Sequence, residues 1–158
     1  MKNIQVLKPK YRVEECLSEI KECLDIGWTG MGYKTIEFED RWKTYTSLNH
    51  AHFLSSATVG LHLAVKILKE KYNWHDGDEV ITTPFTFVST NHSILYENLK
   101  PCFADIDDSL NLDPQSVKDK INKNTKAIIF VGIGGNTKNL IEIIQIAKNN
   151  NIKVILDA

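Results

Sequence analysis

The sequence has few cysteines and no excess of charge of either sign. Its three cysteines, Cys16, Cys23 and Cys102, lack the paired close spacing of a zinc site. We therefore expect no metal site and three reduced thiols that serve in packing. Lysine and arginine, 19 together, nearly balance the 20 aspartates and glutamates. This balance argues against a nucleic acid or an anionic membrane surface as the partner.

Long apolar runs are missing as well. Residues 1–8 hold no apolar core of the length found in signal peptides. No segment reaches the roughly 18 apolar residues that a membrane span needs. These features predict a cytoplasmic protein that does not enter a membrane. With 158 residues, 42% of them hydrophobic, the chain is long enough for one domain with a sizeable core, whose partner is a small molecule or another protein.

Two patterns divide the chain near residue 50. In residues 13–24 and 37–48 the apolar residues recur at helical spacing and predict amphipathic helices, joined by a glycine-rich loop over 27–33. That loop is either a plain linker or a contact for a ligand or partner. From Phe53 on, predicted strands and helices alternate. The strands are the segment beginning at Phe53 and residues 79–82, 101–106, 125–131 and 152–156; the helices are 58–72, 88–98, 114–121 and 140–149.

This alternation predicts an α/β fold. Several of the strands are apolar on both faces, which is typical of a mostly parallel sheet with helices on both sides. In such sheets ligands bind at the carboxyl ends of the strands. The sequence therefore places the site among the segments that follow the strands.

The stretch over residues 53–64 reads FLSSATVGLHLA and is the segment around which the predicted site is built. It predicts a strand that turns into a helix at Ala57 and Thr58. Small residues there leave the first backbone N–H groups uncovered at the positive end of the helix dipole, an arrangement that most often binds phosphate. The same residue types also form an ordinary helix N-cap with no ligand, so this stretch alone leaves both interpretations open.

Four stretches together resemble the DegT/DnrJ/EryC1/StrS family of sugar aminotransferases. They are residues 55–64, 77–91, 103–106 and 154–158, in the order and spacing of that family. Upstream, Gly30-x-Gly32 followed by Phe38-Glu39 matches its N-terminal pattern, so the resemblance covers nearly the whole chain. It implies a dimeric enzyme of fold type I that uses pyridoxal 5'-phosphate (PLP) to move an amino group from glutamate to a keto group of a nucleotide-linked sugar.

The resemblance also implies which residues contact the cofactor. Ala57 and Thr58 match the pair that holds the cofactor phosphate, and Phe87 matches the aromatic residue that stacks on the pyridine ring. Asp157 matches the carboxylate that pairs with the ring nitrogen and keeps it protonated. Ala158 matches the residue that packs on the opposite face of the ring.

The same resemblance assigns the two parts of the chain. Residues 1–50 are expected to be an N-terminal helical segment whose loop contacts substrate through Thr29, Gly30 and Gly32 and takes part in the dimer. Residues 51–158 are expected to be a partial PLP-binding large domain. The remainder of that domain and a small C-terminal domain are missing from the sequence given.

The sequence departs from the family pattern in two places. Residues 132–136, GIGGN, replace a loop that usually carries larger side chains. The Schiff-base lysine of the family follows the position of Asp157, where this sequence has only Ala158. Lys153 is a poor substitute, because four residues of strand separate it from Asp157 by roughly 13 Å. We therefore expect the chain as given to be inactive alone.

Two other functions fit parts of the sequence. A nucleotide-sugar dehydratase of the same family uses PLP with histidine in place of the lysine. A non-enzymatic phosphate-binding α/β domain would use residues 132–135 as its phosphate loop, but that glycine run does not match G-x-G-x-x-G.

Overall fold

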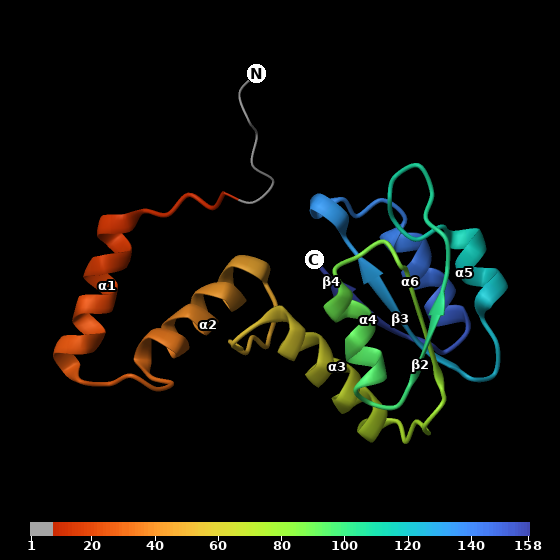
Figure 1. The fold of residues 1–158 in the computed structure, drawn as a ribbon, viewed down its shortest axis with the longest axis horizontal. Helices are drawn as coiled ribbons and strands as arrows, with labels where there is room; N and C mark the ends of the chain where they lie inside the picture. Colours follow the sequence, from red (N-terminus) through yellow and green to blue (C-terminus); the bar gives the residue numbers. More distant parts are fainter. Residues whose placement is uncertain (1–7) are drawn as a thin grey trace. The chain divides into compact units, whose positions relative to one another are not determined.

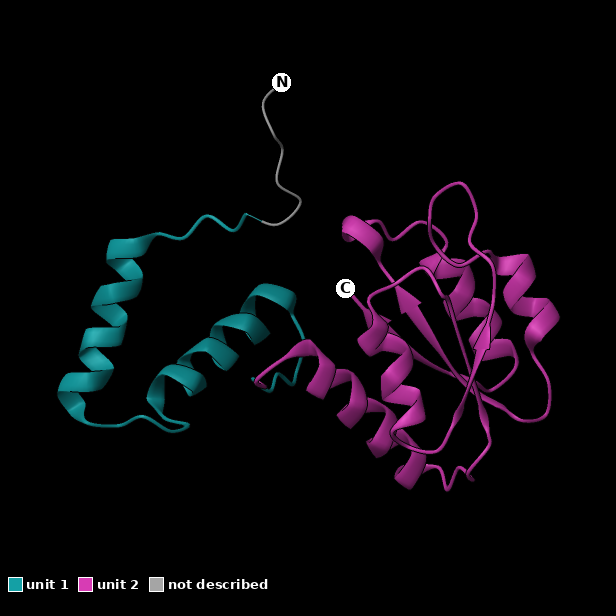
Figure 2. Ribbon diagram, viewed as in Figure 1, with its two compact units in different colours: residues 1–53 teal, residues 54–158 magenta. Residues whose placement is uncertain are grey.

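The computed structural model describes residues 8–158 and divides the chain into two compact units, residues 1–53 and 54–158 (Figure 2). Residues 1–8, from which we predicted that the chain has no signal peptide, lie almost wholly outside the described residues.

The N-terminal unit contains helices α1 (Val13–Ile26) and α2 (Tyr33–Thr46). Helix α1 ends because Gly27 adopts a left-handed backbone with φ 76°, from which its N–H reaches the carbonyls of Cys23 and Leu24. Helix α2 begins four residues before the predicted start at residue 37. Lys34 of α2 pairs with Glu22 of α1 at 3.0 Å. No residue of either helix is buried, so their apolar side chains remain exposed within this unit.

The C-terminal unit is built on a sheet of four parallel strands in the order β2-β1-β3-β4 (Figure 1). The strands are β1 (Glu79–Thr82), β2 (Lys100–Phe103), β3 (Thr125–Val131) and β4 (Lys153–Asp157). The helices are α3 (Ala57–Lys71), α4 (Val88–Leu95), α5 (Pro114–Lys120) and α6 (Leu140–Asn149), with a short 3-10 turn η1 (Ile133–Gly135) after β3. The predicted parallel sheet is confirmed.

Apolar side chains on alternating positions of the strands build a core on each face of the sheet. On one face Ile129 of β3 packs with Val65 of α3 and Ile94 of α4, all fully buried. On the other face Phe130 of β3 packs with Ile143 of α6, also fully buried. Helices therefore cover both faces, as the sequence predicts.

The predicted strand at Phe53 was wrong. Residues 51–56 form no strand, and α3 begins directly at Ala57. A strand requires a neighbour to share its hydrogen bonds, and no strand of the described sheet pairs with this segment.

Two predicted elements end earlier than expected, since β2 stops at Phe103 and α4 stops at Leu95. After β2 the chain continues in a loop in which Ile106 makes an isolated bridge to Leu112.

Helix α6 provides a matched test of this packing. Ile143 is fully buried, whereas Ile141 of the same helix is 78% exposed. We expect Ile143→Ala to lower the free energy of unfolding by about 2–5 kcal/mol, because it leaves a cavity in the core. We expect Ile141→Ala to change it by less than about 0.5 kcal/mol. Urea denaturation of both variants measures the difference, and equal losses would contradict the packing of α6 on the sheet.

Candidate functional site

A pocket of about 230 Å³ lies where the first turns of α3 meet the carboxyl end of β4. It brings together three of the five predicted cofactor residues, Ala57, Asp157 and Ala158. The full lining is Ala57, Gly60, Leu61, Ala64, Ile155, Leu156, Asp157 and Ala158. The pocket therefore lies at the edge of the sheet where parallel α/β proteins bind their ligands.

Small side chains keep this pocket open. Ala57, Gly60 and Ala64 lie along one face of α3, at helical spacing, and turn toward β4. Leu61 of the same helix is buried in the core beneath them and anchors α3 on the sheet. All three residues belong to the pocket lining, and none carries a side chain larger than a methyl group.

The first turn of α3 is only partly capped. The hydroxyl of Ser56 accepts a hydrogen bond from the N–H of Val59 at 3.3 Å, as an N-cap residue does. Within residues 8–158, the N–H groups of Ala57 and Thr58 and the Thr58 hydroxyl have no hydrogen-bond partner. The helix start thus combines an ordinary N-cap with free donors for an anion, and Thr58 is half-buried beside the pocket.

Asp157 is held by a hydroxyl group that the sequence analysis did not single out. The Thr90 hydroxyl donates to Asp157 Oδ2 at 2.6 Å, and Thr86 Oγ1 lies 2.9 Å from Thr90 Oγ1. Thr90 is fully buried in the first turn of α4. The spacing of the two threonines, four residues apart at a predicted helix start, was the only signal of this contact in the sequence.

Phe87 does not line the pocket. It is the N-cap residue of α4, and its side chain is 74% exposed. It follows Thr86 directly, so the loop that ends at α4 carries both the exposed ring and the hydroxyl next to Thr90. Stacking of Phe87 on a cofactor stays a prediction.

The predicted substrate residues all belong to the N-terminal unit. Thr29 and Gly30 line a pocket of about 360 Å³ beside Trp28. Gly32 packs against the Trp28 ring so closely that a Cβ there would lie 2.6 Å from Cδ1 of the indole. The Trp28 indole N–H also donates to the Met31 carbonyl at 2.8 Å. A larger residue at position 32 would therefore force the Trp28 ring to move, and a role of Gly32 in substrate binding stays a prediction.

A network around Asp107 fixes the loop that follows β2. The Asp107 carboxylate accepts hydrogen bonds from the hydroxyl of Ser109, from Asn139 Nδ2 at 2.9 Å and from the Ser109 backbone N–H at 2.8 Å. These donors lower the pKa of Asp107 to about 2. Because Asn139 is the N-cap residue of α6, the network ties this loop to the start of that helix.

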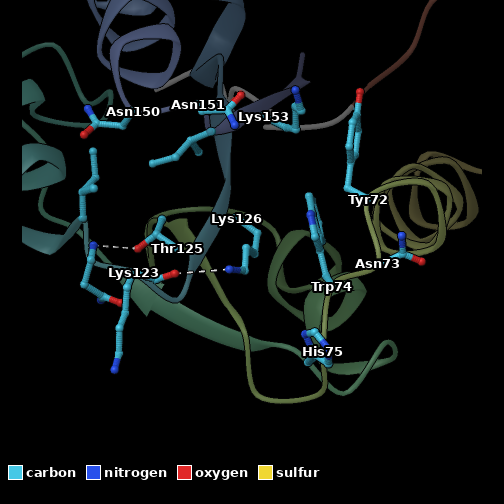
Figure 3. Close-up of a pocket in the computed structure, with 13 residues that line it drawn as sticks. Tyr72, Asn73, Trp74, His75, Lys123, Thr125, Lys126, Asn150, Asn151 and Lys153 are labelled. Atoms are coloured by element: carbon cyan, nitrogen blue, oxygen red, sulfur yellow. Dashed lines mark hydrogen bonds between the residues drawn. The ribbon is translucent and has the colours of Figure 1, made fainter.

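A second pocket, of about 580 Å³, lies at the amino ends of β3 and β4 (Figure 3). Its lysines have local partners. Lys126 donates to the Lys123 carbonyl at 3.2 Å and lies 3.7 Å from Asp78, and the Lys153 ammonium lies 4.4 Å from the centre of the Tyr72 ring. Helices α3 and α6 end here, and these positive charges offset the partial negative charge of their last carbonyls. We therefore place the functional site at the opposite edge of the sheet, where β4 has its carboxyl end.

No helix among residues 8–158 has the length and apolar character needed to cross a membrane. In the same part of the chain, no three side chains among histidine, cysteine, aspartate and glutamate come together as metal ligands would.

Known proteins match this chain over nearly its whole length. The model of the DegT/DnrJ/EryC1/StrS aminotransferase family matches residues 10–158. The spore coat polysaccharide biosynthesis protein SpsC of Bacillus subtilis is 36% identical over 146 residues. The UDP-4-amino-4-deoxy-L-arabinose–oxoglutarate aminotransferase of Shewanella sediminis is 37% identical over 146 residues. Each alignment covers 92% of this chain but only 36% or 37% of the relative.

A solved structure of E. coli GDP-4-keto-6-deoxy-D-mannose-3-dehydratase with bound hydrated PLP has a TM-score of 0.90 and 27% identity to this chain. The alignment covers 100% of this chain and 41% of the dehydratase. Other similar structures hold PLP or its amino form, PMP. These likenesses confirm the predicted fold class, part of the large domain of a PLP-dependent fold type I enzyme, and the predicted cofactor.

The Asp107 network predicts a specific dependence of stability on pH. Because the folded state lowers the pKa of Asp107 from 3.8 to about 2, its contribution to stability is complete above 3.8 and disappears as the pH falls toward about 2. We expect Asp107→Asn to lower the free energy of unfolding at neutral pH and to reduce the further loss on acidification. Urea denaturation at neutral pH and at a pH of about 2 measures the free energy of unfolding under both conditions.

Asp108→Asn is the matched control, because Asp108 is the exposed neighbour of Asp107. This substitution should leave the free energy of unfolding at neutral and at acidic pH close to that of the parent chain. An identical acid response of all three proteins would contradict the proposed contribution of Asp107.

Proposed function

Because this chain belongs to the DegT/DnrJ/EryC1/StrS aminotransferase family, we propose that it is the N-terminal portion of a PLP-dependent enzyme. That enzyme transfers an amino group from glutamate to a keto group of a nucleotide-linked sugar. The observation that carries the proposal is the pocket in which Asp157, at the end of β4, lies beside the open first turn of α3. The name of the Shewanella sediminis relative, a UDP-sugar aminotransferase, supports the substrate class.

The residues of this pocket fit PLP. Two backbone N–H groups and a hydroxyl, from Ala57 and Thr58, are available for the phosphate. Asp157 Oδ2 is held by Thr90, and within the described chain Oδ1 accepts no hydrogen bond, so it is free to accept a hydrogen bond from the protonated ring nitrogen. Ala158 lies beside it and Phe87 offers an exposed aromatic face. When bound, PLP supplies an electron sink for the reaction.

The remaining assignments are also proposals. We place substrate contacts at Thr29, Gly30 and Gly32, with residues 1–50 as the helical segment that carries them and residues 51–158 as the partial cofactor domain. We propose a homodimer, which fits the exposed apolar side chains of α1 and α2. We also propose that the protein is cytoplasmic. We also propose that the 158-residue chain alone is inactive, because no residue that lines the pocket is a lysine.

A dehydratase of the same family is the second candidate. The E. coli dehydratase structure matches this chain with a TM-score of 0.90, so the fold is compatible with this activity as well. The two activities differ in the residue that follows the position of Asp157 in the family, lysine in the aminotransferases and histidine in the dehydratases. The sequence of the full-length protein after Ala158 distinguishes them.

Binding of PLP to this chain tests the cofactor site. We expect Thr58→Val to weaken binding because it removes a hydroxyl beside the phosphate, and Phe87→Ala to weaken it because it removes the stacking ring. Each loss should be about 3- to 10-fold in the dissociation constant, measured by absorbance titration. Thr137→Val and Phe103→Ala change the same residue types at exposed positions elsewhere and should bind as the parent does. Indistinguishable binding by all four variants would contradict the cofactor site.

The full-length enzyme tests the reaction. We expect Asp157→Asn to lower the rate of amino transfer by at least about 10²-fold, the size of the effect when one preorganised electrostatic partner is removed. A neutral amide cannot stabilise the protonated ring nitrogen. The assay follows glutamate consumption with a nucleotide-linked keto-sugar as acceptor. Near-normal turnover of a correctly folded variant would show that Asp157 is not the partner of the ring.

A further inference from the structure

The hydroxyl groups of Thr86 and Thr90 form a directional chain that ends on Asp157. Thr90 Oγ1 lies 2.6 Å from Asp157 Oδ2 and 2.9 Å from Thr86 Oγ1. An ionised carboxylate can only accept hydrogen bonds, so the single hydroxyl proton of Thr90 must point to Asp157. The Thr90 oxygen is then left as an acceptor, and Thr86 must donate to it. Such a chain polarises each bond in turn and strengthens the one to the carboxylate.

Both ends of the Thr90–Asp157 bond are held rigidly. Thr90 is fully buried, its N–H donates to the Phe87 carbonyl at 3.1 Å, and its own carbonyl accepts from the Ser93 hydroxyl at 2.7 Å. Its branched side chain has few rotamers in a helix. Asp157 is the last residue of β4, and its carbonyl accepts from the Gly132 N–H at 2.8 Å. The bond therefore joins two fixed backbones rather than two mobile side chains.

A carboxylate that is held at one oxygen has a defined plane. The last torsion of an aspartate is broad when nothing restrains it, and a free carboxylate rotates. The bond to Thr90 fixes Oδ2, so the lone pairs of Oδ1, which has no partner among residues 8–158, keep one direction. We propose that Thr90, oriented by Thr86, is a positioning residue that aims the free oxygen of Asp157 at the ring nitrogen of PLP. This inference rests on the proposed function.

Two substitutions at Thr90 separate the hydroxyl from the side-chain shape. Thr90→Val keeps the shape and removes the hydroxyl, and Thr90→Ser keeps the hydroxyl. We expect Thr90→Val to weaken PLP binding by about 3- to 10-fold, because the released carboxylate must lose its rotational freedom when it meets the ring nitrogen. Thr90→Ser should stay within about 2-fold of the parent. Thermal unfolding of both variants identifies any loss of folding.

Two comparisons show whether Thr90 acts through Asp157. In an Asp157→Asn background, Thr90→Val should cause no further loss of PLP affinity, because the carboxylate that it positions is already absent. The carbocyclic analogue of PLP, in which C–H replaces the ring nitrogen, should bind the parent and Thr90→Val equally. A structural role for Thr90 would instead weaken both ligands and add to the effect of Asp157→Asn.

The ligand-free chain provides an independent measurement. The carboxyl carbon resonance of Asp157, identified by its loss in Asp157→Asn, should shift in Thr90→Val and stay in place in Thr90→Ser. An unchanged resonance in Thr90→Val overturns the inference whatever PLP does. If PLP binds the parent and Thr90→Val equally well, the inference fails and the proposed function stands. If the resonance shifts but the parent protein binds no PLP, the hydrogen bond between Thr90 and Asp157 is supported. The cofactor site, and with it the role of Thr90 in PLP binding, is then overturned.

Discussion

The apolar side chains on both faces of β3 are the constraint on which the C-terminal unit depends. Alternate residues of this strand are buried against α3 and α4 on one face and against α5 and α6 on the other. A strand buried on both faces must lie inside a sheet with parallel neighbours and helices above and below. Parallel strands then end at one edge, and this places the last residue of β4 beside the beginning of α3. The position of the candidate site is thus a consequence of the core.

The direction of the helices explains why the two edges of the sheet differ. The first turns of α3 and α4 lie at the edge where β4 ends, so free N–H groups and positive partial charge gather there. The last turns of α3 and α6 lie at the opposite edge, where lysines meet carbonyl groups. An anionic ligand is favoured at the first edge even though the second edge contains the larger pocket and more formal positive charge.

Much of this structure could be predicted from the sequence, because its signals are local. Strands β1 and β3 and helix α6 were predicted at their observed bounds from apolar patterns and turn residues. Ala57 and Asp157, which the family resemblance assigned to one cofactor, line the same pocket. The strand expected at Phe53 was not found, because β-prone residues do not specify a neighbour to pair with. The role of Thr90 was missed, since its partner Asp157 is 67 residues away and a buried threonine resembles any other core residue.

The site contains few charges, and this suits the ligand that it would hold. Its lining on α3 includes the small residues Ala57, Gly60 and Ala64, most of the nearby anion donors are backbone groups, and the charged side chain in the lining is Asp157. Backbone donors cannot rotate away or change protonation, so they hold a phosphate without competing for the carboxylate. A lysine close to Asp157 would pair with it and compete with a cationic group of a ligand for its charge. The hydroxyl groups of Thr90 and Thr86 are neutral, so they restrain the same carboxylate while leaving its charge available.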